Sequence, residues 1–102
     1  MEMANYIFQI LRSQPLIIWS WGFNSPEAVL NGLRFNVSGF KFSGIVEILY
    51  NDGSDLFDIY FFEGEQKVDV IYGCYIDMLI DVIDNKVEKV DNYKERDKRE
   101  YL

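Results

Sequence analysis

The sequence contains no histidine and only one cysteine among its 102 residues. Without histidine, neither a Ser-His-Asp nor a Cys-His catalytic mechanism can be built, and a histidine-ligated zinc site is excluded as well. The lone Cys74 cannot form an intramolecular disulfide, and we expect it to pack in the core, because unpaired cysteines are among the most buried residues. A glycine-rich phosphate-binding loop is also absent.

Long hydrophobic runs are missing too. No window approaches the roughly 20 apolar residues that span a bilayer. A signal peptide is not indicated, because Glu2 stands where such a leader has a cation, and Arg12 and Pro15 interrupt the apolar residues near the N-terminus. We therefore expect a cytoplasmic protein that has no membrane partner.

Positive charge is scarce between Glu47 and Asp91. Between Glu47 and Asp91 there are twelve acidic residues against three lysines, a formal charge of −9, whereas the first 46 residues are nearly neutral. The second half must therefore present a negative field. This distribution argues against direct binding of nucleic acid, and it favours a basic protein partner or no charged partner.

Apolar residues make up 49% of the chain and aromatic residues 17%. A chain of this length forms one domain with one core. We place this domain at residues 1–93 and expect residues 94–102, where both charges alternate, to be a solvated or frayed tail. Each large ring buries roughly 150–250 Å², so the rings exceed what so small an interior needs and some should be exposed.

The spacing of the apolar residues predicts an α+β fold. Helical spacing over residues 3–13 predicts a short N-terminal helix. The same spacing over 74–90 predicts the main, C-terminal helix, packed on one face of a sheet. Its apolar arc consists of Ile76, Leu79, Ile80, Ile83, Val87 and Val90.

Alternation and turn residues between these helices predict a five-stranded, mostly antiparallel meander sheet. A short connecting helix over residues 26–31, after the first strand, is indicated by Ser25-Pro26-Glu27 at its start and Asn31-Gly32 at its end. The predicted strands cover residues 16–23, 33–38, 40–50, 55–63 and 67–72.

Turn residues set the expected register. We predict turns at Ser38-Gly39 and Asp52-Gly53, the second a dipeptide favoured in two-residue hairpins, and a third turn over residues 63–66. This register places Phe61 opposite Gly44, where the ring would cover the bare backbone. The face that it turns toward the helices consists of Leu33, Phe35, Val37, Phe42, Val46, Ile48, Phe57, Ile59, Phe61, Val68 and Val70.

The opposite face of the predicted sheet is the first candidate site. It is too apolar for a surface that meets only solvent, and such patches tend to be interfaces. Either another chain covers it, or the N-terminal helix or a loop carrying Trp19 and Trp21 folds over it; both alternatives stay open. The apolar residues of this candidate partner surface are Ile45, Leu49, Leu56, Tyr60, Phe62 and Ile71.

The second candidate site is a row of carboxylates on the main helix. The residues follow one another at i, i+4, i+7 and i+11, which at about 100° per residue confines them to a stripe roughly 60° wide. The stripe is either a docking site for a basic surface or a solvated helix face. This candidate acidic docking stripe consists of Asp77, Asp81, Asp84 and Glu88, and Asp91 and Glu95 would extend it.

Two further arrangements of carboxylates offer weaker routes to chemistry. Residues 51–55 together with Asp58 resemble a calcium loop in composition, but the ligand order does not fit, and hairpin-turn conformation explains the residues. Glu47 and Asp58 fall opposite each other in the predicted register, but an exposed pair stays ionised and does not share a proton. We therefore expect no metal site and no cofactor.

Three functions follow from these observations. The first is a non-enzymatic protein-interaction module that forms a homo-oligomer, such as a homodimer, through the candidate partner surface. The second is a small acidic inhibitor or immunity-type protein whose carboxylates block a basic, nucleic-acid-binding partner. The third is a metal-dependent enzyme that uses only Asp and Glu, with the metal held by Asp52, Asp55 and Asp58.

Overall fold

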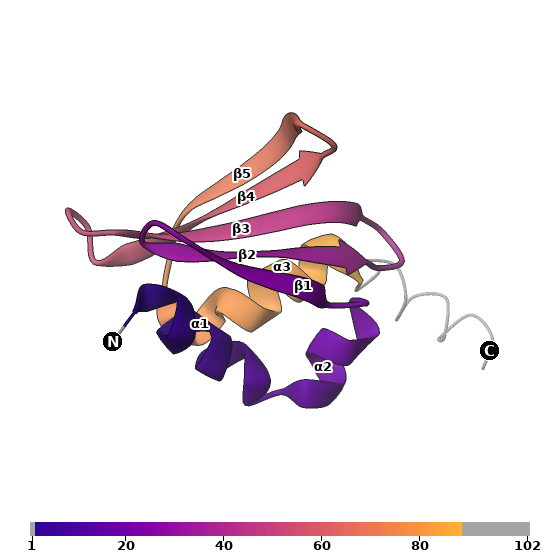
Figure 1. Ribbon diagram of the computed structural model, residues 1–102, viewed down its shortest axis with the longest axis horizontal. Helices are drawn as coiled ribbons and strands as arrows, with labels where there is room; N and C mark the ends of the chain where they lie inside the picture. The colour runs from indigo at the N-terminus through magenta and orange to yellow at the C-terminus, as the bar shows by residue number, and fades with distance from the viewer. Residues whose placement is uncertain (1, 89–102) are drawn as a thin grey trace, which may run out of the picture.

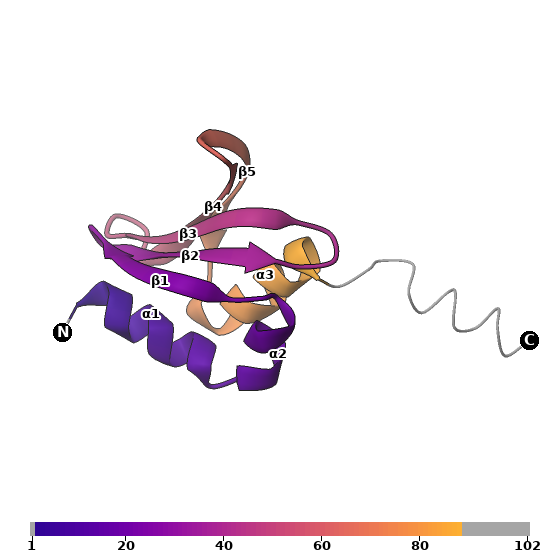
Figure 2. The same cartoon turned by 45° about the vertical axis from the view of Figure 1, so that its right-hand side comes forward.

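The computed structural model describes residues 2–88, which form two layers (Figure 1). One layer is a five-stranded antiparallel sheet in the order β1-β2-β3-β4-β5. The other layer consists of helices that lie together on one face of that sheet, as a second view also shows (Figure 2). The strands are β1 (Asn24–Val29), β2 (Gly32–Ser38), β3 (Ser43–Asn51), β4 (Leu56–Glu63) and β5 (Gln66–Cys74). The helical segments are α1 (Met3–Arg12), α2 (Pro15–Ser20), the 3-10 turn η1 (Ile76–Met78) and α3 (Leu79–Val87). The predicted α+β meander is thus confirmed.

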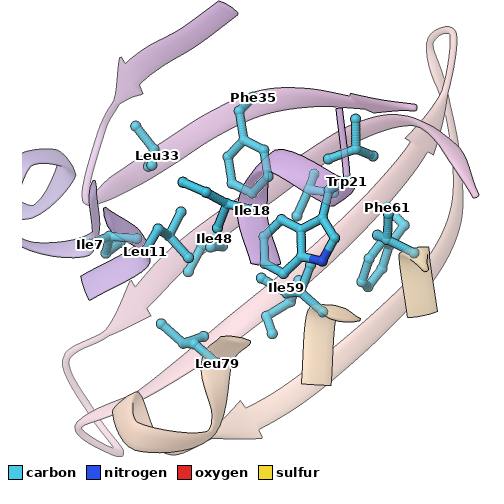
Figure 3. Packing of buried hydrophobic residues seen from close by; sticks show 14 of the residues in the cluster. Ile7, Leu11, Ile18, Trp21, Leu33, Phe35, Ile48, Ile59, Phe61 and Leu79 are labelled. Carbon is cyan, nitrogen blue, oxygen red and sulfur yellow. The ribbon is translucent and has the colours of Figure 1, made fainter. Parts of the chain in front are cut away.

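A single apolar core fills the space between the two layers. The helix α1 contributes Ile7 and Leu11, which lie one turn apart, and α3 contributes Leu79 and Ile83 at the same spacing. Trp21 follows α2 and is fully buried, with its indole among the surrounding core side chains (Figure 3). From the sheet side, the core receives nine residues of the predicted inner face: Leu33, Phe35, Val37, Phe42, Val46, Ile48, Phe57, Ile59 and Phe61.

The two terminal helices occur close to where the sequence predicts them. The helix predicted over residues 3–13 is α1. The main helix predicted over 74–90 is shorter at its start, because Cys74 is still the last residue of β5 and only η1 precedes α3. Val90, Asp91, Glu95 and the tail at 94–102 lie outside the described residues.

The first strand and the short second helix are exchanged relative to the prediction. Residues 15–20 form α2, with Pro15 at its first turn, so the strand predicted over 16–23 is wrong. In this window nearly every residue is apolar, and alternation therefore carries little information, whereas a proline favours the first turn of a helix. The helical turn buries Ile18 and Trp21 three residues apart and leaves Trp19 79% exposed.

Residues 24–29 form β1 instead of the connecting helix predicted over 26–31. Pro26 is tolerated because β1 is an edge strand, and a register shift between Asn24 and Glu27 accommodates it. Asn31 adopts a left-handed conformation with φ of 61° in the turn that joins β1 to β2. The Asn31-Gly32 dipeptide therefore marks a hairpin and not a helix end.

Two of the predicted turns are longer in the structure. Ser38 pairs with Ser43, so residues 39–42 form the β2–β3 loop in place of a turn at Ser38-Gly39. The backbone N–H groups of Lys41 and Phe42 in this loop both donate to the Val87 carbonyl, at 2.8 and 3.3 Å. The loop thereby caps the end of α3, a contact between distant parts of the chain.

The β3–β4 connection is also longer than the predicted two-residue turn. Asn51 pairs with Leu56, and its side-chain oxygen accepts hydrogen bonds from the N–H groups of Gly53 (2.9 Å) and Ser54 (3.3 Å). Both longer connections shift the pairing by an even number of residues, so the inward face is kept although the predicted partners are wrong.

Gly44 illustrates the change of partners. It pairs with Val37, and the ring that covers it is that of Phe42, not Phe61. A Cβ atom at position 44 would lie 2.9 Å from the Phe42 ring and would collide with the carbonyl oxygen of Phe62. An aromatic ring thus covers the glycine as predicted, but it is a different ring, and the position has no room for a side chain.

The register of β5 differs from the predicted one by an odd number of residues. Glu63 pairs with Gln66, but a register shift next to Phe61 sets that residue opposite Asp69. A single extra residue turns every following side chain to the other face. Val68 and Val70, predicted to face the core, therefore do not: Val68 is 42% exposed, and Val70 pairs with Tyr60.

None of the helices described between residues 2 and 88 has the length and apolar character needed to cross a membrane.

Candidate interaction surfaces

The outer face of the sheet, which we define as the side of β1 to β5 directed away from α1, α2 and α3, has no helix on it within residues 2–88 (Figures 1 and 2). Ile7 and Leu11 anchor α1 in the core, and Trp21 is buried there too. The N-terminal helix and the tryptophan-containing segment therefore lie on the inner side. Of the two alternatives for covering this face, folding over by the N-terminal segment is ruled out.

Five of the six residues of the candidate partner surface lie on this outer face, at alternate positions of β3 and β4: Ile45, Leu49, Leu56, Tyr60 and Phe62. The sixth, Ile71, does not. It pairs with Ile59 and packs partly buried against the core, because the bulge in β5 turns it inward. The same bulge brings Val70 beside Tyr60 and Tyr72 to the outer face, where Tyr72 is 67% exposed. Simple alternation could not have identified these two.

Charged side chains on the outer face are organised around the aromatic rings. The Arg34 guanidinium lies 4.0 Å from the Glu47 carboxylate and 5.9 Å from the centre of the Phe62 ring. The Lys67 ammonium lies 5.1 Å from the centre of the Tyr60 ring. Cations at these distances are attracted to the negative faces of the rings. The face thus combines apolar contact area with charges of both signs.

Tyr60 lies at the centre of this arrangement. Its ring meets that of Tyr72 edge to face, with 6.3 Å between ring centres. Partial burial raises the pKa of the Tyr60 hydroxyl above its ordinary value, and the nearby Asp58 carboxylate raises it further. The hydroxyl therefore stays protonated at neutral pH and can donate a hydrogen bond to another chain.

The predicted pairing of Glu47 with Asp58 is wrong. Glu47 lies opposite Tyr60 on one side and Arg34 on the other, while Asp58 lies opposite Leu49. The Asp58 carboxylate accepts a hydrogen bond from the Gly73 N–H at 3.0 Å. The structure thus separates the two carboxylates instead of joining them.

Both edges of the sheet are poor templates for an added strand. On one edge, β1 contains Pro26 and a register shift. On the other edge, β5 has two register shifts, and the Asp69 carboxylate accepts a hydrogen bond from the Val70 N–H at 2.8 Å. Proline, bulges and charged side chains are the usual means by which proteins blunt an edge.

The acidic docking stripe is divided into two halves. Asp84 accepts a hydrogen bond from the indole N–H of Trp21 at 2.8 Å, and Glu88 accepts one from the Phe40 N–H at 2.8 Å. Both are partly buried, so they stabilise the fold. Asp77 and Asp81 are exposed, and no hydrogen bond or ion pair among the described residues involves them. Of the stripe residues that the structure describes, Asp77 and Asp81 are thus the two whose carboxylates are not engaged by the fold.

The remaining candidates for chemistry do not converge on one site. Within residues 2–88, no group of three or more Asp, Glu, Cys or His side chains could hold a metal ion. In the β3–β4 loop, Asp55 accepts a hydrogen bond from the Tyr50 hydroxyl, which raises the pKa of that tyrosine. Cys74 is buried as expected, and burial, with a contribution from Asp77, raises the pKa of its thiol. A protonated, buried thiol is a poor nucleophile.

Comparisons of this chain with protein-family models, with curated proteins and with solved structures gave no match.

Proposed function

We propose that this protein is a non-enzymatic interaction module that self-associates through the outer face of its sheet. The observation that carries this proposal is that every helix within residues 2–88 packs on the same side of the sheet. The opposite side carries apolar and aromatic side chains that no helix of the described part of the chain covers. Contiguous apolar patches of this kind mark interfaces more often than solvent-facing surfaces.

The dimensions of the sheet suit a dimer interface. Strands β3 and β5 have nine residues each, which at about 3.3 Å per residue gives a length near 30 Å. Five strands spaced about 4.8 Å apart give a width near 20 Å. A footprint of this size is of the same order as the roughly 800 Å² per partner that stable complexes bury.

The charges on the outer face favour a second copy as the occupant. Arg34 on β2 and Lys67 on β5 flank Glu47 on β3 and Asp58 on β4, the two strands between them. In a two-fold symmetric dimer the same patch meets itself, so cations of one copy can face carboxylates of the other. The face can therefore pack against itself although the whole chain has a net charge of −7.

The blunted edges determine the mode of association. Addition of a strand at β1 or β5 would require straight, unpaired backbone, which Pro26 and the bulges interrupt. Packing of one sheet on another needs only apolar side chains, about 10 Å between the two sheets. We therefore expect face-to-face stacking.

Sedimentation velocity of the full chain tests the proposal. We expect the wild type to sediment as a dimer at high micromolar concentration. Phe62→Lys should sediment as a folded monomer, because the new ammonium group at position 62 would have to be buried in the interface without a carboxylate to pair with. The matched control is Leu30→Lys, which introduces the same charge at a 91% exposed position in the β1–β2 turn and should remain dimeric. Circular dichroism establishes that each variant is folded.

A wild type that stays monomeric at high micromolar concentration would contradict self-association. A dimer that survives Phe62→Lys and also Leu49→Lys would place the interface elsewhere on the molecule.

A further inference from the structure

A second surface lies on the helical side of the molecule, away from the outer face. An open groove of about 450 Å³ runs between α1, α2 and the start of α3. Its apolar lining comes from all three segments: Tyr6 and Ile10 on α1, Ile17 on α2, and Ile76 and Ile80 on η1 and α3. These side chains flank the core without being enclosed by it, and Tyr6 is 40% exposed.

The rim of this groove is negatively charged. Asp77 and Asp81 line it, and none of the nine lining residues is a lysine or an arginine. Four residues apart along a helical path, the two carboxylates are separated by about 6 Å along the axis. They are the two stripe carboxylates that do not bind Trp21 or Phe40. An apolar floor beside two carboxylates, with no cation among the described lining residues, complements a ligand that is both apolar and cationic.

We propose that this groove binds an amphipathic helix of a partner protein that carries lysine or arginine beside its apolar face. Helices dock in such grooves by inserting side chains at i, i+3, i+4 and i+7. A partner with cations at i and i+4 presents them at the spacing of Asp77 and Asp81.

Other occupants fit the groove less well. A nucleic acid or an acidic peptide would meet the carboxylates with like charge. A small ligand would be poorly enclosed, since binding pockets bury about 70–90% of a ligand's surface. A second copy placed symmetrically on the groove would bring Asp77 and Asp81 toward their own counterparts.

Fluorescence anisotropy with a synthetic probe tests the proposal on the full chain. The probe is a labelled 18-residue helical peptide with leucine at i, i+3, i+4 and i+7 and lysine on the flanking positions; its control has glutamate in place of lysine. We expect saturable binding of the lysine peptide only. Asp77→Asn together with Asp81→Asn should weaken it about tenfold, which corresponds to about 1.4 kcal/mol.

The matched control removes the same charge elsewhere. Glu63→Gln together with Glu65→Gln lies at the β4–β5 turn, far from the groove lining, and should change the affinity less than about twofold. Amide shifts in a heteronuclear NMR titration should be largest around Tyr6, Ile10 and Ile80. Equal loss of affinity in both double variants, binding of the glutamate peptide, or the absence of binding by the lysine peptide would each overturn the proposal.

One further variant separates a partner helix from the chain's own C-terminus. Residues 89–102 contain five of the ten cations of the chain. Substitution of Lys94, Arg96, Lys98 and Arg99 by glutamine should leave the affinity for the lysine peptide unchanged. A clear gain in affinity would mean that this segment competes for the groove, and it would overturn assignment of the groove to a partner.

Discussion

The contact between Trp21 and Asp84 shows how a residue that stabilises the fold can be mistaken for part of a binding surface. The Trp21 side chain is fully buried, and its indole N–H needs an acceptor. Asp84 of α3 provides it at 2.8 Å. From the sequence alone, Asp84 belongs to an acidic stripe directed at a partner, because periodicity places residues on a helix face but does not reveal which of them reach back into the fold.

This contact leads to a prediction about stability. Asp84→Ala should lower the free energy of unfolding by about 1–3 kcal/mol, because it leaves the buried indole N–H without an acceptor. Asp81→Ala, one turn earlier and exposed, should change it by less than about 0.5 kcal/mol. Urea unfolding followed by tryptophan fluorescence measures both. Equal effects of the two substitutions would show that the hydrogen bond does not stabilise the fold.

Helices and strands whose apolar residues repeat with a single period were predictable from the sequence. Segments whose conformation depends on contacts with distant parts of the chain were not. The helix α1 and the inward faces of β2, β3 and β4 follow directly from spacing. The β2–β3 loop could not be predicted, because its N–H groups bind the carbonyl of Val87, a residue about 45 positions later in the sequence. The strand predicted in place of α2 was wrong because the apolar residues there are nearly continuous. The helix predicted in place of β1 was wrong because Ser25-Pro26-Glu27 suits a helix start as well as a bulged edge strand.

The candidate sites were predictable to the same extent. The outer face was found because β3 and β4 alternate strictly, and Ile71 was misplaced because no local signal marks the one-residue bulge of β5. The bulge also brings a residue of β5 into contact with α3. In the predicted register Asp69 would face solvent; in the structure it faces the helices, where its carboxylate accepts a hydrogen bond from Lys86 at 2.8 Å. The Lys86 ammonium also lies 5.6 Å from the centre of the Phe61 ring.

The link between β5 and α3 predicts a specific pH dependence. The Lys86 hydrogen bond, assisted by the Val70 N–H, lowers the pKa of Asp69. A carboxyl whose folded pKa is lowered adds stability above its unfolded pKa, about 3.9, and loses that contribution as the pH falls through the folded pKa. Asp69→Asn should therefore be less stable than the wild type at pH 6, and the difference should shrink below about pH 4.

Urea unfolding at a series of pH values measures this difference. Glu65→Gln in the same hairpin removes a charge from an exposed turn and is the control, with little expected effect at pH 6. A difference between wild type and Asp69→Asn that is constant from pH 6 to pH 3 would show that the carboxylate charge is not what stabilises the contact.

At the scale of the whole molecule, the two proposed surfaces are separated by the sheet itself. The helices α1, α2 and α3 all lie on the side of the sheet opposite the outer face (Figure 1), and the groove is lined by residues of these helical segments. The two surfaces also differ in chemistry. The outer face carries charges of both signs, whereas the charged residues among the described lining of the groove are both carboxylates. The two proposals are therefore compatible in one molecule, since a dimer formed through the outer faces would leave both grooves directed away from its interface.

This separation predicts that the two interactions respond independently. Phe62→Lys should abolish the dimer and leave the affinity for the lysine peptide unchanged. Asp77→Asn with Asp81→Asn should weaken peptide binding about tenfold and leave the dimer intact. Raising the ionic strength from about 50 to about 500 mM shortens the screening length from about 14 to about 4 Å. Peptide binding should weaken, because it depends on two exposed carboxylates, while an interface dominated by apolar burial should persist. Sedimentation and anisotropy of the wild type and of both variants, each at the two ionic strengths, measure this. If either set of substitutions altered both interactions, or if salt dissociated the dimer as readily as the peptide, the two surfaces would have to be coupled through the sheet.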